Sequence, residues 1–520
     1  MVSTKYTRHI RHQNKQYVTG RKSTRKHKRT QENAIIGASS GEGASSGEGA
    51  STGGDVINSG GYGCIFKPAL KCKGEPRLRN KVSKLMTTRH SEDEYKFITK
   101  YKEKLEHIPD YTDYFLLEEV TICTPDKLTT ADLKYYNKKC TTLQKQDLTS
   151  TNINEHLDNV LAINMPNGGV DVGDFLAKHH SEESLIQLNI SLIDLLNNGI
   201  VLMNQIHIYH CDIKETNILV QAKKKTKKEE NGVKNGVVQS KLYTRLIDWG
   251  ISVEWTKGHE IPVKLLNKPL QYNLPFSVIL FNNHFLSLYN GMLKKTPSPN
   301  YKTIKKVVLQ FIIVWFKERG MGHFQAINQT LQLLMLNEED SDSDSDSDSN
   351  TNNVFDEDLE DLQSLDDDLN EKTQKQQHDY MFTYFYIADY LTTILSKYTM
   401  RGELNLLKYF EEVFIKNADL WGFIMSYATI LELYYYNYEK LNEQEVAAFN
   451  KLKQIIVSFL FETAIRPINV DQLTTELDLL TELFRKCKTV PSKYRDYQLH
   501  NRTTNVRSVF DKITEHLDQQ

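Results

Sequence analysis

The order of apolar patterns along the chain restricts its fold more than any other feature. Short apolar runs flanked by glycine, "DVINSGGYGCIFKP" (55–68) and "NKVSKLM" (80–86), predict a β-hairpin followed by another strand. Later, apolar residues recur at helical spacing over 181–206 and over most of 380–485. This order, in which strands come first and helices follow, predicts an α+β protein with a sheet-containing lobe and a helical lobe.

Low-complexity stretches interrupt this order. Residues 1–31 are basic and lead into the Gly/Ser-rich stretch 37–54, so 1–54 is predicted to be a disordered tail and linker. The Lys-rich stretch 221–241 carries "NG" turn signals and predicts a long exposed hairpin loop. Residues 337–377 are strongly acidic, and their mutual repulsion predicts disorder.

Composition limits where the protein works and what it binds. A length of 520 residues with 39% hydrophobic residues allows one large or two ordinary cores, and a net charge of −2 gives no general attraction to nucleic acid or membranes. The longest apolar run, 307–316, is too short to span a bilayer, so we expect a soluble protein. The six cysteines include no C-x-x-C pair, which predicts free thiols in a reducing compartment.

The stretch "YHCDIKETNILV" (209–220) sets polar groups at fixed offsets before an apolar run. One interpretation is a solvated loop between a helix and a strand. The other is a chemical site, in which Asp212 accepts a proton, Lys214 meets negative charge and Asn217 holds a metal ion. The motifs elsewhere in the chain decide between the two.

A glycine-rich turn precedes this stretch. In "NSGGYGCIF", Gly60 and Gly63 fit the last two glycines of the pattern G-x-G-x-x-G-x-V, Tyr62 and Ile65 also fit it, and Asn58 stands where the first glycine would be. Glycines at such positions let backbone N–H groups approach phosphates closely. A plain hairpin turn is the alternative interpretation.

Two further charged residues, Lys84 and Asp248, stand beside or within apolar strand patterns. Lys84 sits inside an apolar strand, where an unpaired ammonium would be costly, so we expect a carboxylate beside it. Glu94 is the first candidate for that carboxylate, and Glu92 is its rival. In "TRLIDWGIS" (244–252), Asp248 follows an apolar strand, and a simple turn is again the alternative.

Taken in series, these motifs resemble the eukaryotic-type protein kinase family. There the glycine loop covers ATP, a strand lysine pairs with a helix glutamate, His-x-Asp-x-Lys-x-x-Asn is the catalytic loop and Asp-Phe-Gly holds magnesium. The resemblance implies catalytic residues Asp212, Lys214, Lys84 and Glu94, ATP-binding residues Asn58, Gly60, Gly61, Gly63, Ile65, Lys84, Ile163, Asn164 and Met165, and magnesium ligands Asn217 and Asp248.

The resemblance continues beyond the site. "NADLWGFIMSY" (417–427) is similar to the family's Asp-x-Trp helix, which implies that Asp419 anchors the catalytic loop, and Arg466 falls in a similar Arg-Pro segment. "LAINMPNGGVDVGDFL" (161–176) is similar to the hinge between lobes. By pattern the chain looks most like the divergent kinases of large nucleocytoplasmic DNA viruses.

The resemblance implies a bilobal, kinase-like α+β fold with large insertions. Its small β-rich N-lobe would cover 55–166 and its larger helical C-lobe 167–500, with an insertion at about 280–410 that includes the acidic tract and a tail at 501–520.

Some positions depart from the family pattern. Cys211 replaces the usual arginine and Trp249 the usual phenylalanine, although neither change removes a phosphoryl-transfer group. No clear Ala-Pro-Glu is present. "QYNLPFS" (271–277) is its nearest replacement, which leaves Arg466 without its usual acidic partner and substrate docking open.

The family resemblance favours a serine/threonine protein kinase that transfers the γ-phosphate of ATP to Ser or Thr hydroxyls of proteins. Alternatives are a pseudokinase or virion scaffold, and a small-molecule kinase of the aminoglycoside or choline type. We expect an intracellular location, in host cytoplasm or virion if the protein is viral. No membrane partner is expected, and nucleic acid would bind only through the basic run "RKSTRKHKR" (21–29). The oligomeric state stays open.

Overall fold

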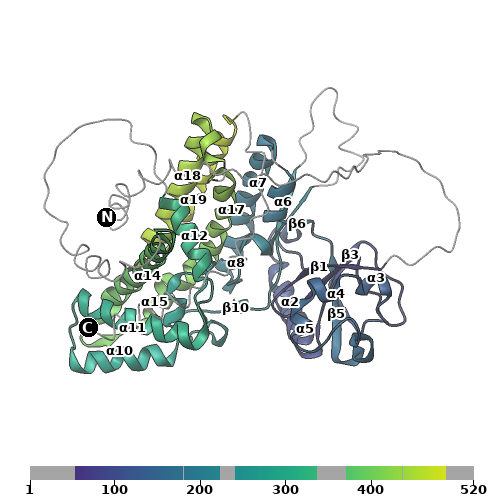
Figure 1. Cartoon of the computed structure of the whole chain (residues 1–520), viewed down its shortest axis with the longest axis horizontal. Coiled ribbons are helices and arrows are strands. Elements are labelled where there is room, and N and C mark those ends of the chain that lie inside the picture. Colours follow the sequence, from purple (N-terminus) through teal and green to yellow (C-terminus); the bar gives the residue numbers. More distant parts are fainter. Residues whose placement is uncertain (1–52, 180, 223–240, 336–370, 436, 488–520) are drawn as a thin grey trace. The chain divides into compact units, whose positions relative to one another are not determined.

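The computed structural model describes residues 53–179, 181–222, 241–335, 371–435 and 437–487 (Figure 1). The predicted tail, most of the acidic tract, the interior of the Lys-rich loop and the C-terminal tail lie outside these residues. Two compact units divide the described chain: residues up to Tyr95 with Glu119–Asn167 form unit 1, and Lys96–Glu118 with the residues from Gly168 onward form unit 2. Strands and helices are both present, so the α+β prediction is confirmed.

Unit 1 is built on an antiparallel sheet. Its described strands follow the order β1-β2-β3-β5-β4, and the first two form the predicted hairpin. Their bounds are β1 Asp55–Ser59, β2 Gly63–Lys67, β3 Lys81–Thr87, β4 Thr121–Cys123 and β5 Val160–Pro166. The pattern over 55–86 therefore located the hairpin and the next strand correctly.

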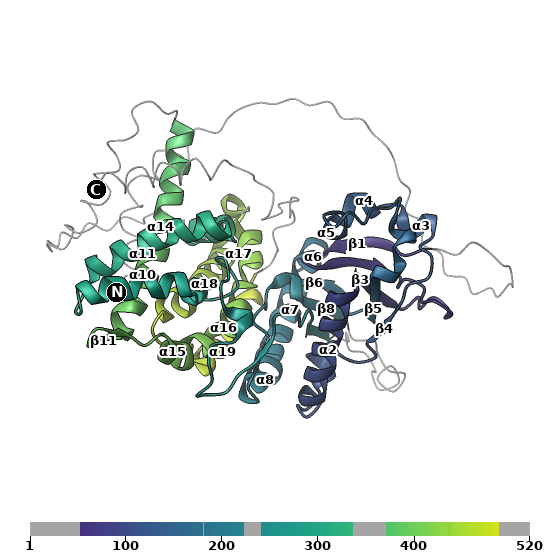
Figure 2. The same ribbon diagram turned by 90° about the horizontal axis from the view of Figure 1, so that it is seen from below.

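Three short helices lie at the β1–β2 edge of this sheet (Figure 2). They are α3 Thr130–Leu133, α4 Tyr136–Lys139 and α5 Thr141–Gln144, all between β4 and β5. Tyr136 and Leu143 are fully buried and share a core with Val56, Cys64 and Phe66 of the hairpin. This apolar packing attaches the helices to the sheet.

Helix α2, Thr88–Leu105, begins earlier than predicted. The pattern "SEDEYKFITKYKEKL" (91–105) predicts a helix that starts at Ser91 with an acidic first turn, but the helix follows directly on β3 and its first turn contains no acidic residue. The boundary was wrong because the strand leads into the helix without an intervening loop. The residues of α2 from Lys96 onward are counted with unit 2.

The predicted helix at 181–206 is continuous in unit 2. It consists of α7 Glu182–Asp194, a π-helical turn Leu195–Ile200 and α8 Val201–Gln205. In the described part of the chain, this segment alone is long and apolar enough to cross a membrane, and 56% of its most apolar window is buried inside the protein. Its Asn189 donates hydrogen bonds to Leu477 O and Thr481 Oγ1, so the helix is packed against another helix of unit 2.

Two small sheets of unit 2 contain the strands that precede and follow the Asp212 loop. Strands β6 Val170–Asp171, β8 Ile218–Ala222 and β9 Leu242–Leu246 form one sheet, and β7 Ile208–Tyr209 pairs with β10 Val253–Glu254 in another. β8 and β9 are antiparallel, with Ala222 opposite Leu242 and Ile218 opposite Leu246. The strands on either side of the Lys-rich stretch are thus paired as a hairpin, as predicted.

Helices make up most of the rest of unit 2 (Figure 1). They are α6 Val172–Lys178, α10 Asn283–Lys295, α11 Tyr301–Arg319, α12 Phe324–Met335, α14 Glu371–Tyr398, α15 Leu406–Tyr409, α16 Ile415–Met425, α17 Ala428–Tyr435, α18 Glu443–Leu460 and α19 Val470–Phe484, with a small β11 Thr399–Met400 and β12 Glu403–Leu404 hairpin. α14 begins inside the stretch 337–377 that was predicted to be disordered, so that prediction is wrong for 371–377, and the rest of the stretch lies outside the described residues.

The helices of the predicted insertion at 280–410 belong to the core of unit 2. Tyr384 of α14 donates a hydrogen bond to Leu309 O of α11, and the partly buried Lys305 ammonium lies 3.1 Å from the buried Asp389. Tyr390 packs edge-on against Trp421 of α16, with ring centroids 5.8 Å apart. Removing the whole insertion would therefore expose core residues of this unit.

The expectation of free cysteines is wrong for four of the six. Within the described residues, Cys64 is bonded to Cys140 and Cys72 to Cys123, while Cys211 and Cys487 are free and buried. The paired cysteines are 76 and 51 residues apart in sequence, so no local spacing could reveal them. The sheet of unit 1 brings them together.

Candidate functional site

Three predicted nucleotide-site residues form a row across the sheet of unit 1. Ile65 on β2 is directly opposite Lys84 on β3, which is directly opposite Ile163 on β5. Because directly opposite residues in a sheet project from the same face, these three side chains share one face. The row thus sets a cation between two aliphatic side chains.

The ion pair predicted for Lys84 is present, and its partner is Glu94. The Lys84 ammonium lies 2.8 Å and 2.7 Å from the two carboxylate oxygens of Glu94, and both side chains are buried. Its rival, Glu92, is exposed. A buried ammonium gripped in this bidentate way has a fixed position, so it can meet an anionic group without reorganising.

The predicted glycine turn joins β1 to β2. Gly60 N donates to Gly63 O at 2.8 Å and closes the turn, while Asn58 is exposed beside a β-bulge and accepts a hydrogen bond from Ser59 N. A Cβ atom on Gly63 would overlap the Leu85 carbonyl, whereas one on Gly61 would meet nothing within 4 Å. Gly63 is therefore required by the neighbouring strand, and Gly61 leaves the tip open.

The side chain of Asn164 is not on the face of the sheet that carries Ile65, Lys84 and Ile163. Met165, the next residue of β5, is on that face. Asn164 is opposite Ser83, one step along both strands, so its side chain projects from the other face. There it accepts a hydrogen bond from Ser83 Oγ and donates to the sulfur of Cys72. Any role of Asn164 in binding adenine would therefore fall to its backbone.

In unit 2, three side-chain nitrogens converge on the carboxylate of Asp212. Lys214 Nζ lies 3.0 Å from both oxygens, Asn217 Nδ2 donates to Oδ2 at 2.9 Å, and Asn273 Nδ2 donates to Oδ1 at 2.8 Å. Asn217 Nδ2 also contacts the Asp212 carbonyl at 2.9 Å. Asp212, Lys214 and Asn217 are thus brought together as predicted, and their contacts fix the direction of the carboxylate.

The backbone of this loop is anchored by Asp419 on α16. Its two oxygens accept hydrogen bonds from His210 N at 2.8 Å and Cys211 N at 2.7 Å. Burial raises the pKa of Asp419 to about 6, opposed by these two backbone hydrogen bonds. Cys211 has a φ of 58°, a left-handed conformation that non-glycine residues rarely adopt. Asp419 therefore holds the loop in a conformation that it would otherwise seldom take.

His210 is a packing residue. Its ring is buried, lies edge-on to Trp249 with centroids 4.9 Å apart and places Nε2 3.0 Å from Ile247 O. Burial lowers the pKa of His210, so the neutral ring is favoured. A neutral buried imidazole is suited to support the loop and has no access to solvent for proton transfer.

The two predicted magnesium ligands lie at one end of the β8–β9 hairpin. Asn217 immediately precedes β8, Asp248 follows β9 by two residues, and Ile247 N donates to Asn217 O at 3.1 Å. No group of three or more His, Cys, Asp or Glu side chains fit to hold a metal occurs among the residues that the structure describes. One carboxylate and one amide oxygen nevertheless fit magnesium, which usually takes one or two protein oxygens and completes its shell with phosphates and water.

Sequence reasoning missed Asn273, although it noted the surrounding segment 271–277. Trp421 Nε1 donates to Tyr272 O at 2.9 Å, and this contact to α16 positions the neighbouring Asn273. Asn273 lies 61 residues from Asp212 in sequence, and no motif marks it. Lys268 was also missed; burial lowers its pKa, and the Asp212 charge opposes that shift.

A buried acidic group behind the loop was not predicted either. Tyr272 donates a hydrogen bond to Glu215 Oε2 at 2.7 Å, and Glu215 and Glu432 are both buried. Burial, followed by the charge of Glu215, raises the pKa of Glu432 to about 8. The loop is therefore backed by a carboxyl group that is protonated at neutral pH.

Comparison of the chain with models of known protein families and with curated proteins finds no match in either. The contacts around Lys84 and around Asp212 are therefore the basis for its proposed function.

Proposed function

We propose that the protein is a serine/threonine protein kinase that transfers the γ-phosphate of ATP. The observation that carries the proposal is the convergence of Lys214, Asn217 and Asn273 on the Asp212 carboxylate, with the loop backbone held by Asp419. Phosphoryl transfer needs alignment and charge neutralisation more than covalent help, and such a fixed carboxylate supplies alignment.

In this proposal Asp212 orients the substrate hydroxyl and takes its proton while the oxygen attacks the γ-phosphorus and the bond to the β-phosphate oxygen breaks. Lys214, within 3.0 Å of that carboxylate, balances charge on the transferred group. Lys84 grips the inner phosphates and Glu94 keeps its ammonium in place. The glycine turn with Asn58, Gly60, Gly61 and Gly63 covers the nucleotide.

Magnesium, when bound, would neutralise phosphate charge and orient the phosphate chain. Asn217 and Asp248 would hold it, because they lie at the same end of the β8–β9 hairpin and offer oxygen ligands.

Two alternatives make different predictions. A pseudokinase or virion scaffold would have no chemical reason to keep Lys84 paired and Asp212 bound by three donors. A small-molecule kinase would share the Asp212 loop, and the proposal of a protein substrate rests on the resemblance of the glycine turn, Lys214, the Asp419 helix and the Arg466 segment to protein kinases. An intracellular location stays a prediction, and the two disulfides argue against a strongly reducing compartment.

The test is a transfer assay with labelled ATP, magnesium and separate panels of proteins and small molecules. Wild-type protein should label Ser or Thr of a protein, and Asp212→Asn should fold normally yet transfer roughly 10²- to 10⁴-fold more slowly. The matched control is Asp174→Asn, an exposed carboxylate on α6. Near-normal turnover by Asp212→Asn, or labelling of small molecules alone, would refute the proposal.

A further inference from the structure

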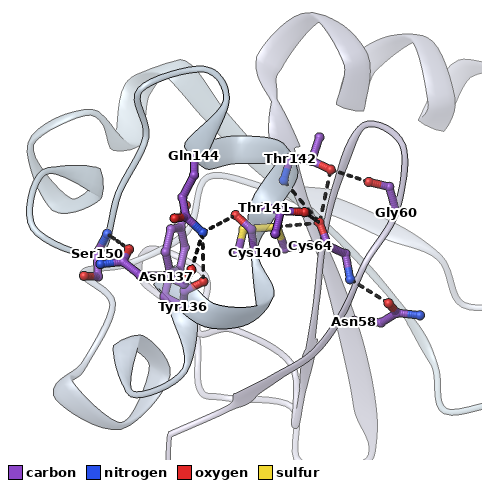
Figure 3. The surroundings of a disulfide bond; sticks show 11 residues. Asn58, Gly60, Cys64, Tyr136, Asn137, Cys140, Thr141, Thr142, Gln144 and Ser150 are labelled. Carbon is purple, nitrogen blue, oxygen red and sulfur yellow. Dashed lines mark hydrogen bonds between the residues drawn. A yellow bond between two sulfur atoms is a disulfide. The ribbon is translucent and has the colours of Figure 1, made fainter. Parts of the chain in front are cut away.

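The glycine turn of unit 1 is covalently attached to the helices inserted between β4 and β5. Cys64 follows Gly63 at the start of β2, and its disulfide partner Cys140 lies between α4 and α5 (Figure 3). Both cysteines are fully buried. One covalent bond therefore joins the base of the turn to a segment 76 residues away.

The residues after Cys140 contact the turn itself. Thr142 Oγ1 donates to Gly60 O at 2.5 Å, and Thr142 N donates to Ser59 Oγ at 3.3 Å (Figure 3). Thr142 is two residues from Cys140, so the disulfide restricts the positions of the Thr142 hydroxyl and amide relative to the turn. Thr142 therefore holds the Gly60 carbonyl, which is one residue from the open tip of the turn at Gly61.

The second disulfide of unit 1 has no contact with the glycine turn among the residues that the structure describes. Cys72 and Cys123 form a bond beside the Asn164 side chain, on the other part of the sheet. It stabilises unit 1 in the same general way, by linking distant segments. It is therefore a matched control for any effect specific to the glycine turn.

We propose that the Cys64–Cys140 disulfide and Thr142 form a clamp that positions the glycine turn, and that reduction of this disulfide loosens the turn. Thr142 is a positioning residue that acts through Gly60. In the reduction, an external dithiol gives two electrons to the S–S bond, leaving thiols at Cys64 and Cys140 and the dithiol as a cyclic disulfide. The core packing of Tyr136 and Leu143 would remain, so α4 and α5 would stay attached.

A consequence for nucleotide binding rests on the proposed function. If the turn covers ATP, a loose turn must be ordered at the moment of binding, and that cost weakens affinity. The oxidised protein would bind magnesium-ATP more tightly than the reduced protein. The clamp itself does not depend on that function, because the mobility of the turn can be measured without any ligand.

The experiment measures amide hydrogen exchange in peptides covering 56–66, in the full chain under oxidising conditions and after treatment with dithiothreitol. Variants are Cys140→Ser, Thr142→Val, the control Cys72→Ser, and the control Thr141→Val, whose hydroxyl has only a 3.4 Å contact with Ser59. Mass spectrometry of alkylated protein first establishes which cysteines are bonded. Magnesium-ATP affinity is measured on the same samples.

Reduction, Cys140→Ser and Thr142→Val should each speed exchange in this peptide by about tenfold, and the two controls should leave it unchanged. Free thiols at Cys64 and Cys140 in protein purified without reductant, or equal exchange in all samples, would overturn the clamp. Should Cys140→Ser fail to fold, reduced wild type and Thr142→Val still decide the question. Faster exchange in a protein that binds no nucleotide in either state would uphold the clamp and reject the proposed kinase function.

Discussion

Asn273 Nδ2 donates a hydrogen bond to Asp212 Oδ1, 2.8 Å away, from a segment that no local motif connects to the loop. Lys214 and Asn217 hold the same carboxylate from within the loop, so Asn273 supplies the contact from outside it. The direction of the Asp212 carboxylate thus depends on the segment after β10 as well as on its own motif.

Asn273→Ala should therefore lower kcat by roughly 10- to 100-fold, which corresponds to the 1.5–3 kcal/mol typical of a hydrogen bond to a charged group. KM for ATP should change little, because Asn273 has no assigned contact with nucleotide. The control is Asn300→Ala, which removes the N-cap of α11 and should reduce thermal stability without this kinetic change. Equal kcat in wild type and Asn273→Ala would show that the contact does not position the base.

The ion pair of Lys84 and Glu94 gives a second prediction. Glu94→Ala leaves a buried ammonium without its bidentate partner and should lower the free energy of unfolding by about 3–5 kcal/mol, measured by urea denaturation. Glu92→Ala, an exposed neighbour on α2, should have almost no effect. The double variant Lys84→Met with Glu94→Leu should recover stability but not magnesium-ATP affinity. Recovery of both would remove Lys84 from nucleotide binding.

Glu432 predicts how stability depends on pH. Its pKa is raised from 4.5 to about 8, so the folded protein holds this proton where the unfolded chain has lost it. Stability contributed by this group is therefore present at low pH and is lost as pH rises from about 4.5 to about 8, at up to about 1.4 kcal/mol per pH unit.

Glu432→Gln should flatten that dependence, because glutamine keeps the shape and carries no charge. Melting temperatures measured from pH 5 to pH 9 should fall more steeply for wild type than for Glu432→Gln, and Glu106→Gln, an exposed control on unit 2, should follow wild type. Parallel curves for all three proteins would mean that Glu432 titrates as an exposed carboxyl does.

The segment after Asp248 gives a fourth prediction, that activity does not require its phosphorylation. Cys211 supplies no cation to pair with a phosphate, and Ser252 is buried with its hydroxyl donating to His210 O at 3.2 Å. Lys264 instead orders the segment from within, since its ammonium donates to Gly250 O at 3.0 Å and Ser252 O at 3.1 Å.

Phosphatase-treated protein made in bacteria should therefore turn over as fast as untreated protein, and Thr256→Ala should be nearly silent. Lys264→Met should reduce turnover about tenfold or more, equivalent to about 1.4 kcal/mol of barrier, while Lys257→Met at an exposed position of the same segment should not. A tenfold loss on phosphatase treatment would contradict this account. Ser252→Ala should cost about 1 kcal/mol of stability, because it removes the buried hydrogen bond to His210 O.

The sequence predicted contacts that are encoded locally. The hairpin at 55–68 and the next strand were found because strand and turn residues alternate there, and Glu94 was found because an ammonium inside an apolar strand needs a nearby carboxylate. The grouping of Asp212, Lys214 and Asn217 was likewise found because they occupy one short loop. Each of these inferences needed only a few neighbouring residues.

Contacts between distant segments could not be predicted in the same way. Asn273 reaches Asp212 across 61 residues, and Cys64 reaches Cys140 across 76, with nothing in either segment to name its partner. Asn164 was assigned to ATP binding because it lies in the hinge-like sequence, and only the strand register shows that its side chain projects from the face opposite to Lys84. Register and packing, which depend on the whole sheet, decided these cases.

The β8–β9 hairpin provides a position where a reporter or tag can be inserted. The chain between its strands leaves at Ala222 and returns at Leu242, whereas Asn217 and Ile247 meet at the other end, roughly 17 Å away at about 3.3 Å per strand residue. A fluorescent reporter or an affinity tag spliced into 223–240 would thus attach at the end of the ladder remote from the Asn217 and Asp248 oxygens. For the same reason, changes in the length or composition of 223–240 during evolution would not disturb those oxygens.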